Sequence, residues 1–142
     1  MTTQTLFLIR GLPGSGKSRM ARQLVDNGKA CVMFEADAWL TYESHKDGYG
    51  FTGARCEYHW TPSRSAQAHD RCQIAVRKSL RNGESVVVSN TFTQRCEMQP
   101  YLNMAADMGI GVEIITATGD YGSVHNIPES VIAAMRQRWE DL

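Results

Sequence analysis

The residues from Gly11 to Ser18 constrain this chain more than any other stretch. They read GLPGSGKS and match the pattern G-x-x-x-x-G-K-[ST] of a phosphate-binding loop. Glycines at these positions let the backbone turn its N–H groups inward around a triphosphate. Lys17 is then expected to reach the β- and γ-phosphates, and the Ser18 hydroxyl to bind Mg²⁺. The predicted nucleotide-binding residues are Gly11, Leu12, Pro13, Gly14, Ser15, Gly16, Lys17 and Ser18.

The sequence on either side of this loop has the expected pattern. A short apolar run at 5–9 predicts a buried strand before it. After it, apolar residues at helical spacing predict a helix over 17–27, whose N-terminal dipole also favours phosphate. The strand, loop and helix together favour a binding site for a nucleoside triphosphate, which we expect to be ATP with Mg²⁺. The alternative interpretation, a glycine-rich turn without a ligand, is less consistent with these flanking patterns.

The composition limits the classes of protein that this chain can represent. Its 142 residues suit a single domain over 1–142. The 15 basic and 15 acidic residues balance, so a nucleic-acid partner would have to be held by a local patch. The four cysteines form no C-x-x-C pair, which favours reduced thiols in a cytoplasmic protein. Neither a signal peptide nor a membrane span is expected, and the oligomeric state stays open.

Strand and helix patterns alternate along the rest of the chain. Strands are predicted at 30–35, 85–88 and 110–117, and helices at 62–81, at 94–108 with a break or kink at Pro100, and from 128 onward. Alternation of this kind predicts a parallel α/β sheet of about four strands flanked by helices, with the strand at 5–9 in its interior. The long segment at 41–61 is predicted to be a loop.

Asp37 is the main candidate for chemistry beyond the phosphate loop. It follows the predicted strand at 30–35, and the carboxyl ends of parallel strands border the ligand crevice. There it can take a proton from an acceptor hydroxyl or, with Ser18, contribute to a metal site. Alternatively, Asp37 caps a short helix, and one residue can do both.

Other polar and aromatic residues are predicted to line the same crevice. Ser89, Asn90 and Thr91 end the third strand, where phosphate-loop proteins commonly place a carboxylate. Arg71 shares a helix face with Arg64 and Lys78, which is either a solvated face or a stripe that binds a nucleic-acid backbone. Four aromatic residues either stack on a base or fill the core and loops: Trp39, Tyr58, Trp60 and Phe92.

The order of these motifs resembles the polynucleotide-kinase-type family of phosphate-loop kinases. The matching segments are RGLPGSGKS at 10–18, EAD at 35–37, YHWTP at 58–62, VVVSNT at 86–91, EMQPY at 97–101 and HNIP at 125–128. The resemblance implies the P-loop kinase fold and ATP-dependent phosphorylation of a hydroxyl, often on a nucleic acid. It assigns Lys17 and Ser18 to nucleotide and metal, and Asp37 to the general base.

Within this family the chain is most similar to small phage-encoded members, including kinases of 5-hydroxymethyluracil in DNA. It departs from polynucleotide 5′-kinases in having only 118–127 in place of a lid helix with an arginine, and Asn90 where an aspartate is common. Arg95 or Arg138 is expected to supply the missing charge, with Arg71 and Arg136 as alternatives. His125, in the segment that replaces the lid, is a further substrate candidate.

The predicted function is therefore phosphoryl transfer from ATP to DNA in the cytoplasm, a host's cytoplasm if the gene is a phage's. The leading acceptor is the hydroxymethyl group of 5-hydroxymethyluracil, and the nearest alternative is a 5′-hydroxyl end. A small-molecule kinase and a non-catalytic ATP-binding protein are the other readings of the same motifs.

Overall fold

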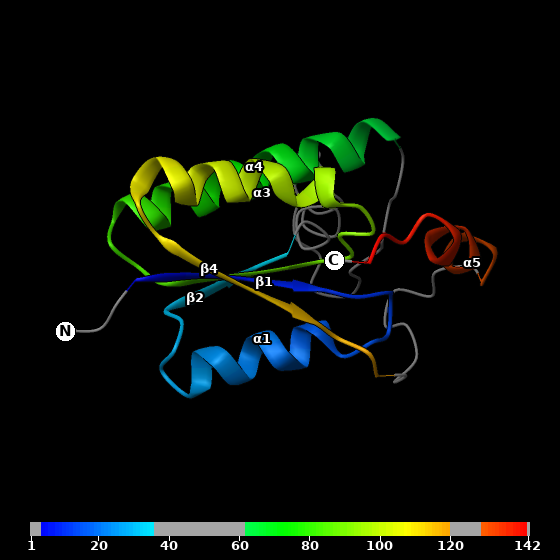
Figure 1. The fold of residues 1–142 in the computed structure, drawn as a ribbon, viewed down its shortest axis with the longest axis horizontal. Coiled ribbons are helices and arrows are strands. Elements are labelled where there is room, and N and C mark those ends of the chain that lie inside the picture. The colour runs from blue at the N-terminus through cyan, green and yellow to red at the C-terminus, as the bar shows by residue number, and fades with distance from the viewer. Residues whose placement is uncertain (1–3, 36–61, 120–128, 142) are drawn as a thin grey trace, which may run out of the picture.

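The computed structural model describes residues 4–35, 62–119 and 129–141, and Figure 1 shows their fold. Four strands form one parallel sheet in the order β2-β3-β1-β4, so the strand before the phosphate loop lies in its interior, as predicted. The elements are β1 (Thr5–Arg10), α1 (Lys17–Asp26), β2 (Val32–Phe34), α3 (Pro62–Arg81), β3 (Val86–Asn90), α4 (Arg95–Met108), β4 (Gly111–Thr116) and α5 (Glu129–Gln137).

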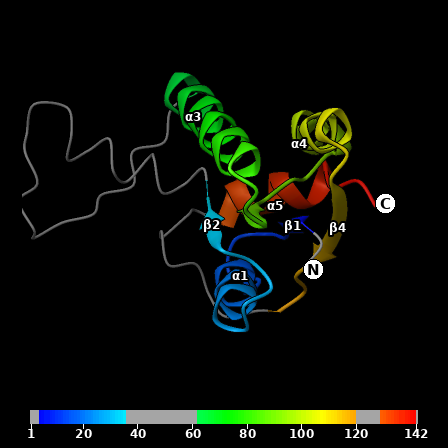
Figure 2. The ribbon, with the colours of Figure 1, turned by 90° about the vertical axis from the view of Figure 1, so that its left-hand side faces the viewer.

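Helices cover both faces of the sheet. Helices α3 and α4 lie on one face and α1 on the other (Figures 1 and 2). Side chains alternate between these two layers along β1, with Leu6 and Leu8 in the α3/α4 core and Phe7 and Ile9 in the α1 core. All three valines at 86–88 have no exposed surface, as expected for a strand covered on both faces.

Strand β3 is longer than the sequence predicts. It continues through Ser89 and Asn90, because these residues pair with Ile9 and Arg10 of β1. Helix α4 runs through Pro100, in agreement with the helix predicted at 94–108. Pro100 lacks only its own N–H, and the capping box at Gln94 and Glu97 together with packing of Met98 and Tyr101 stabilises the surrounding turns.

Helix α5 lies beyond the carboxyl ends of the strands rather than on a face of the sheet (Figure 1). The sequence pattern predicts four inward residues in this region, but Val131 is 40% exposed and Trp139 lies after the helix end. Ile132 is buried, and Met135 is half-buried. A helix at the end of a sheet has less apolar surface to pack against than a helix on its face. A narrower stripe of apolar side chains on α5 is therefore buried.

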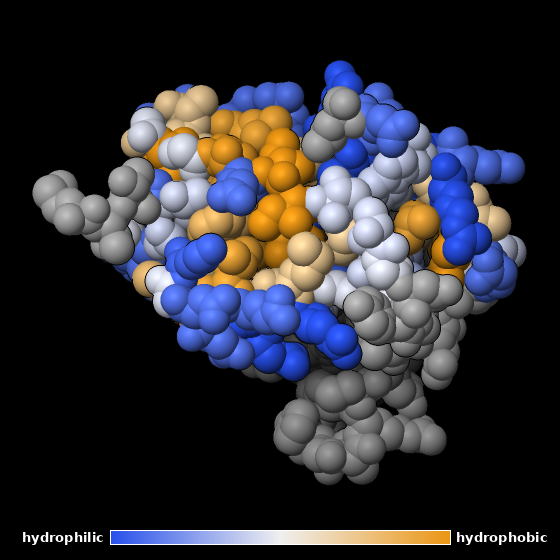
Figure 3. Space-filling view, turned by 60° about the horizontal axis from the view of Figure 1, so that its bottom comes forward, coloured by the Kyte–Doolittle hydropathy of each residue, from blue (hydrophilic) through white to orange (hydrophobic). Residues whose placement is uncertain are grey.

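Strands β2 and β4 are the two edges of the described sheet, and Val112 of β4 is 36% exposed. Figure 3 shows one face of the molecule with an apolar area among hydrophilic side chains. Every helix in the described ranges is too short or too polar to cross a bilayer.

Candidate functional site

The phosphate loop folds as its glycines require. Gly14 and Gly16 have φ angles of 80° and 95°, in the left-handed region that glycine adopts without a Cβ penalty. The Ser15 amide donates to the Leu12 carbonyl at 3.1 Å, and Lys17 Nζ donates to the same carbonyl at 3.1 Å. The loop is therefore a closed turn that carries the lysine's charge at its rim and leads directly into α1.

Gly11 is needed for a different reason, which is close approach. Its amide donates to Thr91 O at 3.2 Å, which brings the start of the loop against the end of β3. A Cβ added at Gly11 would run into Ser15 Oγ and lie 3.0 Å from the carbonyl oxygen of Ala117. The backbone directly after β4 therefore limits this position to glycine.

We expect Gly11→Ala to destabilise the fold by about 1–3 kcal/mol, because the added methyl overpacks a site bounded by backbone. It should also weaken nucleotide binding, since relief of the clash displaces the phosphate loop. The matched control is Gly111→Ala, where an added Cβ meets nothing within 4 Å. Urea unfolding and titration with a fluorescent ATP analogue measure both effects. Equal unfolding midpoints for the two variants would contradict the close approach.

Ser18, the predicted metal ligand, contacts a carboxylate. Its Oγ donates to Glu35 Oε1 at 2.5 Å, and Glu35 directly follows β2. Hydroxyl and carboxylate oxygens are the ligands that Mg²⁺ prefers, so this pair fits the ion that the phosphate loop implies. In the described part of the chain, no three His, Cys, Asp or Glu side chains lie close enough together to hold a metal ion. Phosphate oxygens would therefore have to complete the coordination.

Glu35 was not among the predicted site residues. Its position at the carboxyl end of β2, two residues before Asp37, is the sequence signal that points to it.

The two last residues of β3 point to opposite sides of the sheet. Ser89 follows Val87 by two residues and so faces α1, whereas Asn90 follows Val88 and faces α3 and α4. Both are buried, and Asn90 lies beside Cys72 and Tyr101 in the core. The structure thus places Asn90 in the core instead of opening it to the substrate crevice.

Burial in the core raises the pKa of the Cys72 thiol to about 11. Cys72 therefore stays protonated when folded, and its contribution to stability is present below about pH 9 and is lost as the pH rises toward 11. Because the thiolate is the nucleophile, we expect Cys72 to resist iodoacetamide at pH 8.

A matched variant isolates this thiol from the others. Native wild type and native Cys72→Ala should incorporate the same number of labels. In about 8 M urea, which unfolds the protein, wild type should incorporate one label more than Cys72→Ala. The exposed Cys31 and Cys96 provide the native signal. Mass spectrometry of the labelled protein counts the adducts, and one fewer native label in the variant would contradict the burial of Cys72.

Phe92 was expected either to stack on a base or to fill the core, and the structure places it in the core. Its side chain is 2% exposed and packs edge-on against Tyr101, with ring centroids 5.7 Å apart. A ring enclosed in the core is unavailable for stacking. Its backbone is unusual, with a φ of 44° that costs a non-glycine residue on the order of 1 kcal/mol.

The strained Phe92 backbone is held by Arg10, a residue that sequence analysis did not single out. Arg10 is only 1% exposed, and its Nε donates to Phe92 O at 3.0 Å. Its Nη2 donates to Thr93 O at 3.2 Å and to Glu140 O at 2.6 Å. Its guanidinium carbon also lies 4.0 Å from the ring centroid of Trp139. We call this group of contacts the Arg10 clamp: it joins β1, the loop after β3 and the segment after α5.

Burial lowers the pKa of Arg10, while Asp141, Glu140 and Glu97 raise it. An arginine side chain in a protein stays protonated even when its pKa is lowered, so the Arg10 clamp keeps its positive charge.

The two arginines expected to replace the lid arginine lie near the chain end. The Arg95 amide donates to Glu140 Oε1 at 2.9 Å, and its Nη2 donates to Asp141 O at 2.9 Å. Arg138 is exposed just after α5. Of the alternatives, Arg136 donates to Glu129 at 3.1 Å, and Arg71 is exposed on α3.

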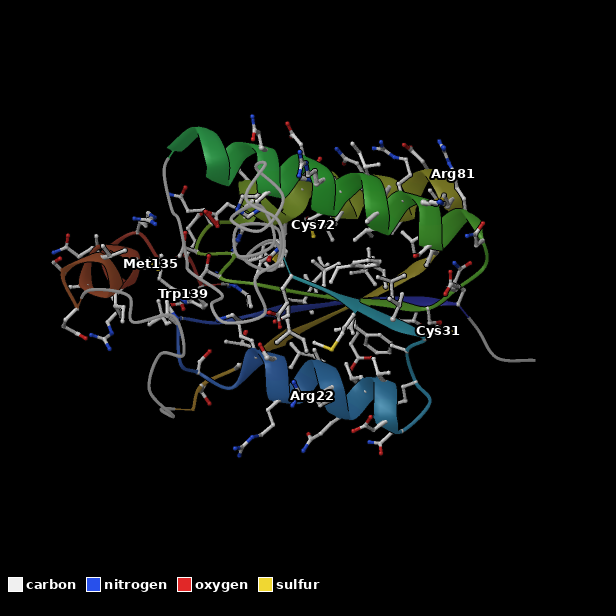
Figure 4. All side chains as sticks on the ribbon, turned by 180° about the vertical axis from the view of Figure 1, so that it is seen from behind. Arg22, Cys31, Cys72, Arg81, Met135 and Trp139 are labelled. Carbon is white, nitrogen blue, oxygen red and sulfur yellow. The ribbon has the colours of Figure 1, made fainter. Side chains whose placement is uncertain are left out.

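A cavity of about 400 Å³ opens beside the phosphate loop. The loop after β4 forms one side of it, held by a 3.0 Å hydrogen bond from the Gly119 amide to Ser15 O. The half-buried Trp139 forms another side and is labelled in Figure 4. The lining residues are Leu12, Ser15, Thr116, Ala117, Thr118, Gly119, Arg136, Trp139 and Asp141.

Five of the predicted site residues lie outside the described residues. They are Asp37, Trp39, Tyr58, Trp60 and His125. The structure therefore brings together the phosphate loop, Ser18, the end of β3 and Thr91, and adds Glu35, Arg10 and Trp139 to them.

The parallel sheet with this loop after its inner strand is the P-loop kinase fold. A model of the AAA domain family matches residues 6–121, most of the chain, and the chain belongs to this family.

Two relatives illustrate the range of proteins with a similar sequence. One is protein PM0531 of Pasteurella multocida (strain Pm70), 27% identical over 93% of this chain and 74% of its own length. The other is human NEDD4-binding protein 2, 30% identical over 70% of this chain but only 5% of that protein.

Solved structures share the fold at low identity. A chain of the Pnkp1/Rnl/Hen1 complex has a TM-score of 0.60 at 15% identity, over 94% of this chain and 39% of that one. A gluconokinase from Sinorhizobium meliloti 1021 has a TM-score of 0.62 at 19% identity, over 99% of this chain and 76% of that one. A variant of the Mycobacterium tuberculosis APS kinase CysC has a TM-score of 0.54 at 19% identity, over 96% and 93%.

Proposed function

We propose that this chain is an ATP-dependent kinase whose acceptor is a hydroxyl on DNA, with the hydroxymethyl group of 5-hydroxymethyluracil as the leading candidate. The observation that carries the kinase proposal is a formed phosphate loop with Ser18 against a carboxylate and a cavity of about 400 Å³ beside it. A nucleotide needs the phosphate loop for its phosphates and the cavity for its base.

The cavity suits the base of ATP. Trp139 offers an aromatic face for stacking. The Thr118 hydroxyl and the backbone groups of Thr118 and Gly119 offer polar contacts. Lys17 and the loop amides hold the β- and γ-phosphates. The base and phosphates then leave the γ-phosphoryl group near the carboxyl ends of β2 and β3, where an acceptor enters.

Transfer needs a base for the acceptor hydroxyl and a means to bear the phosphoryl charge. Asp37 follows Glu35 by two residues, and two residues of chain span at most about 7 Å. This short separation along the chain supports our assignment of the general-base role to Asp37. Mg²⁺ held at Ser18 would neutralise part of the phosphate charge.

The proposed step balances as follows. Asp37 accepts the proton of the acceptor hydroxyl, and the hydroxyl oxygen forms a bond to the γ-phosphorus. The bond from that phosphorus to the bridging β–γ oxygen breaks, and ADP leaves with the electron pair. Arg95 or Arg138 is proposed to bear part of the developing charge.

Two observations support DNA as the acceptor. The motifs resemble those of kinases that act on nucleic acids, and one structural neighbour belongs to a complex described as an RNA repair complex. A bulky acceptor also suits the short segment of 118–127, since a base flipped out of a duplex needs room to enter.

Incubation with γ-labelled ATP, Mg²⁺ and matched duplexes tests the proposal. Two duplexes carry 5′-phosphates and either thymine or 5-hydroxymethyluracil at one position, and a third carries thymine and 5′-hydroxyl ends. We expect label only on the modified duplex. Label on a 5′-hydroxyl duplex alone would instead support the polynucleotide 5′-kinase, and label on neither DNA would overturn both.

A small-molecule kinase is the second candidate. It is favoured by the gluconokinase and APS kinase structures, which this chain matches over 76% and 93% of their lengths. Transfer to a metabolite hydroxyl in the same assay, without DNA binding that weakens as salt rises, would support it.

A further inference from the structure

The carboxyl ends of β2 and β3 bring two oxygen-bearing side chains to one face of the sheet. Phe34 is the last residue of β2 and pairs with Val88 of β3, so Glu35 leaves β2 beside the point where β3 continues into Ser89. Met33 and Val87 both pack on the α1 side, and side chains two residues apart share a face. Since neighbouring strands lie about 4.8 Å apart, Glu35 and Ser89 are neighbours on the face toward α1.

Ser18 joins this pair from the first turn of α1. Its hydroxyl donates to Glu35 Oε1 at 2.5 Å and Ser18 is exposed, so the two lone pairs of the hydroxyl oxygen face away from this bond and can bind a ligand. Three oxygen-bearing side chains from three elements thus converge beside the phosphate loop: a hydroxyl from α1, a carboxylate after β2 and a hydroxyl from β3.

Ser89 indicates that something belongs among them. Its side chain is 2% exposed, and its Oγ has no hydrogen-bond partner among the described residues. A buried hydroxyl left unpaired is costly, and native proteins pair most such groups with protein, water or a ligand. This one faces the side of the sheet where Glu35 meets Ser18.

We infer that Ser18, Glu35 and Ser89 form the protein side of a divalent-cation site, in which the carboxylate comes from β2 and not from the end of β3. The inference rests on the proposed nucleotide function, because the triphosphate supplies the remaining oxygens. Glu35 orients or contacts the cation as the one carboxylate of the set, and Ser89 donates to a cation-bound water or to Glu35. One carboxylate with two hydroxyls holds a cation weakly alone, so the cation arrives with the nucleotide.

Mn²⁺ binding, followed by electron paramagnetic resonance, tests this inference without any turnover. Each protein is saturated with a non-hydrolysable ATP analogue and titrated with Mn²⁺, and analogue affinity is measured separately in EDTA. Glu35→Gln keeps an oxygen that accepts the Ser18 hydrogen bond and removes only the charge. Glu113→Gln, on the exposed part of β4, removes the same charge away from the site and is the control.

We expect Glu35→Gln to weaken Mn²⁺ binding by about 10- to 100-fold, and Ser89→Ala by about 3- to 10-fold. Analogue affinity in EDTA should change by less than about 2-fold in either variant, and Glu113→Gln should match wild type in both measurements. Wild-type Mn²⁺ affinity in Glu35→Gln would overturn the inference. Equal loss of metal and metal-free analogue binding would also overturn it, because it would show a structural role.

These results are separable from those of the kinase assay. Mn²⁺ loss on Glu35→Gln in a protein that transfers no phosphate would support the cation site and contradict only the transfer reaction. Failure of wild type to bind the analogue at all would overturn both proposals.

Discussion

Asp37→Asn is expected to lower kcat by about 10²- to 10⁴-fold while ATP affinity changes by less than about 2-fold. The amide keeps the size and polarity of the side chain but cannot accept the proton of the acceptor hydroxyl. Because the phosphate loop and the cavity hold the nucleotide, the loss falls on the transfer step and not on nucleotide binding.

Asp26→Asn is the matched control, since Asp26 is an exposed residue at the end of α1. Steady-state transfer from labelled ATP and equilibrium titration with a fluorescent analogue give the two quantities independently. Unchanged transfer in Asp37→Asn would remove Asp37 as the base. A parallel loss of analogue affinity would indicate that Asp37 acts in binding.

Arg10→Leu is expected to lower the free energy of unfolding by about 3–5 kcal/mol. The substitution removes the donors to three carbonyl groups, on Phe92, Thr93 and Glu140, and the cation beside Trp139. It also releases the Phe92 backbone, whose φ of 44° is kept only by its surroundings. Arg10→Lys should recover part of the loss, because an ammonium keeps the charge but lacks the planar fork of donors.

Urea unfolding followed by circular dichroism measures these differences, with Arg22→Leu on the exposed face of α1 as the control. Trp139 fluorescence in the native baseline provides a second readout, since the Arg10 clamp holds this ring against the nucleotide cavity. Equal midpoints for Arg10→Leu and Arg22→Leu would show that the Arg10 clamp contributes nothing to stability.

Local patterns were sufficient for much of the fold. The core face of α3, with Ala68, Cys72, Val76 and Leu80 buried, follows from helical spacing alone. The parallel order with β1 inside follows from alternating strands and helices, which need right-handed crossovers. Such patterns work because they report which face of an element is apolar, a property of neighbouring residues.

The candidate site was predicted less completely, for a physical reason. Phe92 lies two residues after β3, where an aromatic ring can face either the crevice or the core, and it packs against Tyr101 in the core. Glu35 belongs to the EAD segment at 35–37, but its contact with Ser18 is what identifies it as a site residue. Trp139 was assigned to a helix stripe, although its ring lies between Arg10 and the cavity.

By itself, the sequence determined the phosphate loop, because Gly14, Gly16, Lys17 and Ser18 act through backbone geometry and chemistry contained within one short segment. Only the tertiary structure decided which distant residues serve that loop. Arg10 and Glu140 are 130 positions apart, and Ser18 and Glu35 are 17 apart. Such contacts depend on strand register and on how the chain end packs, which no local pattern encodes.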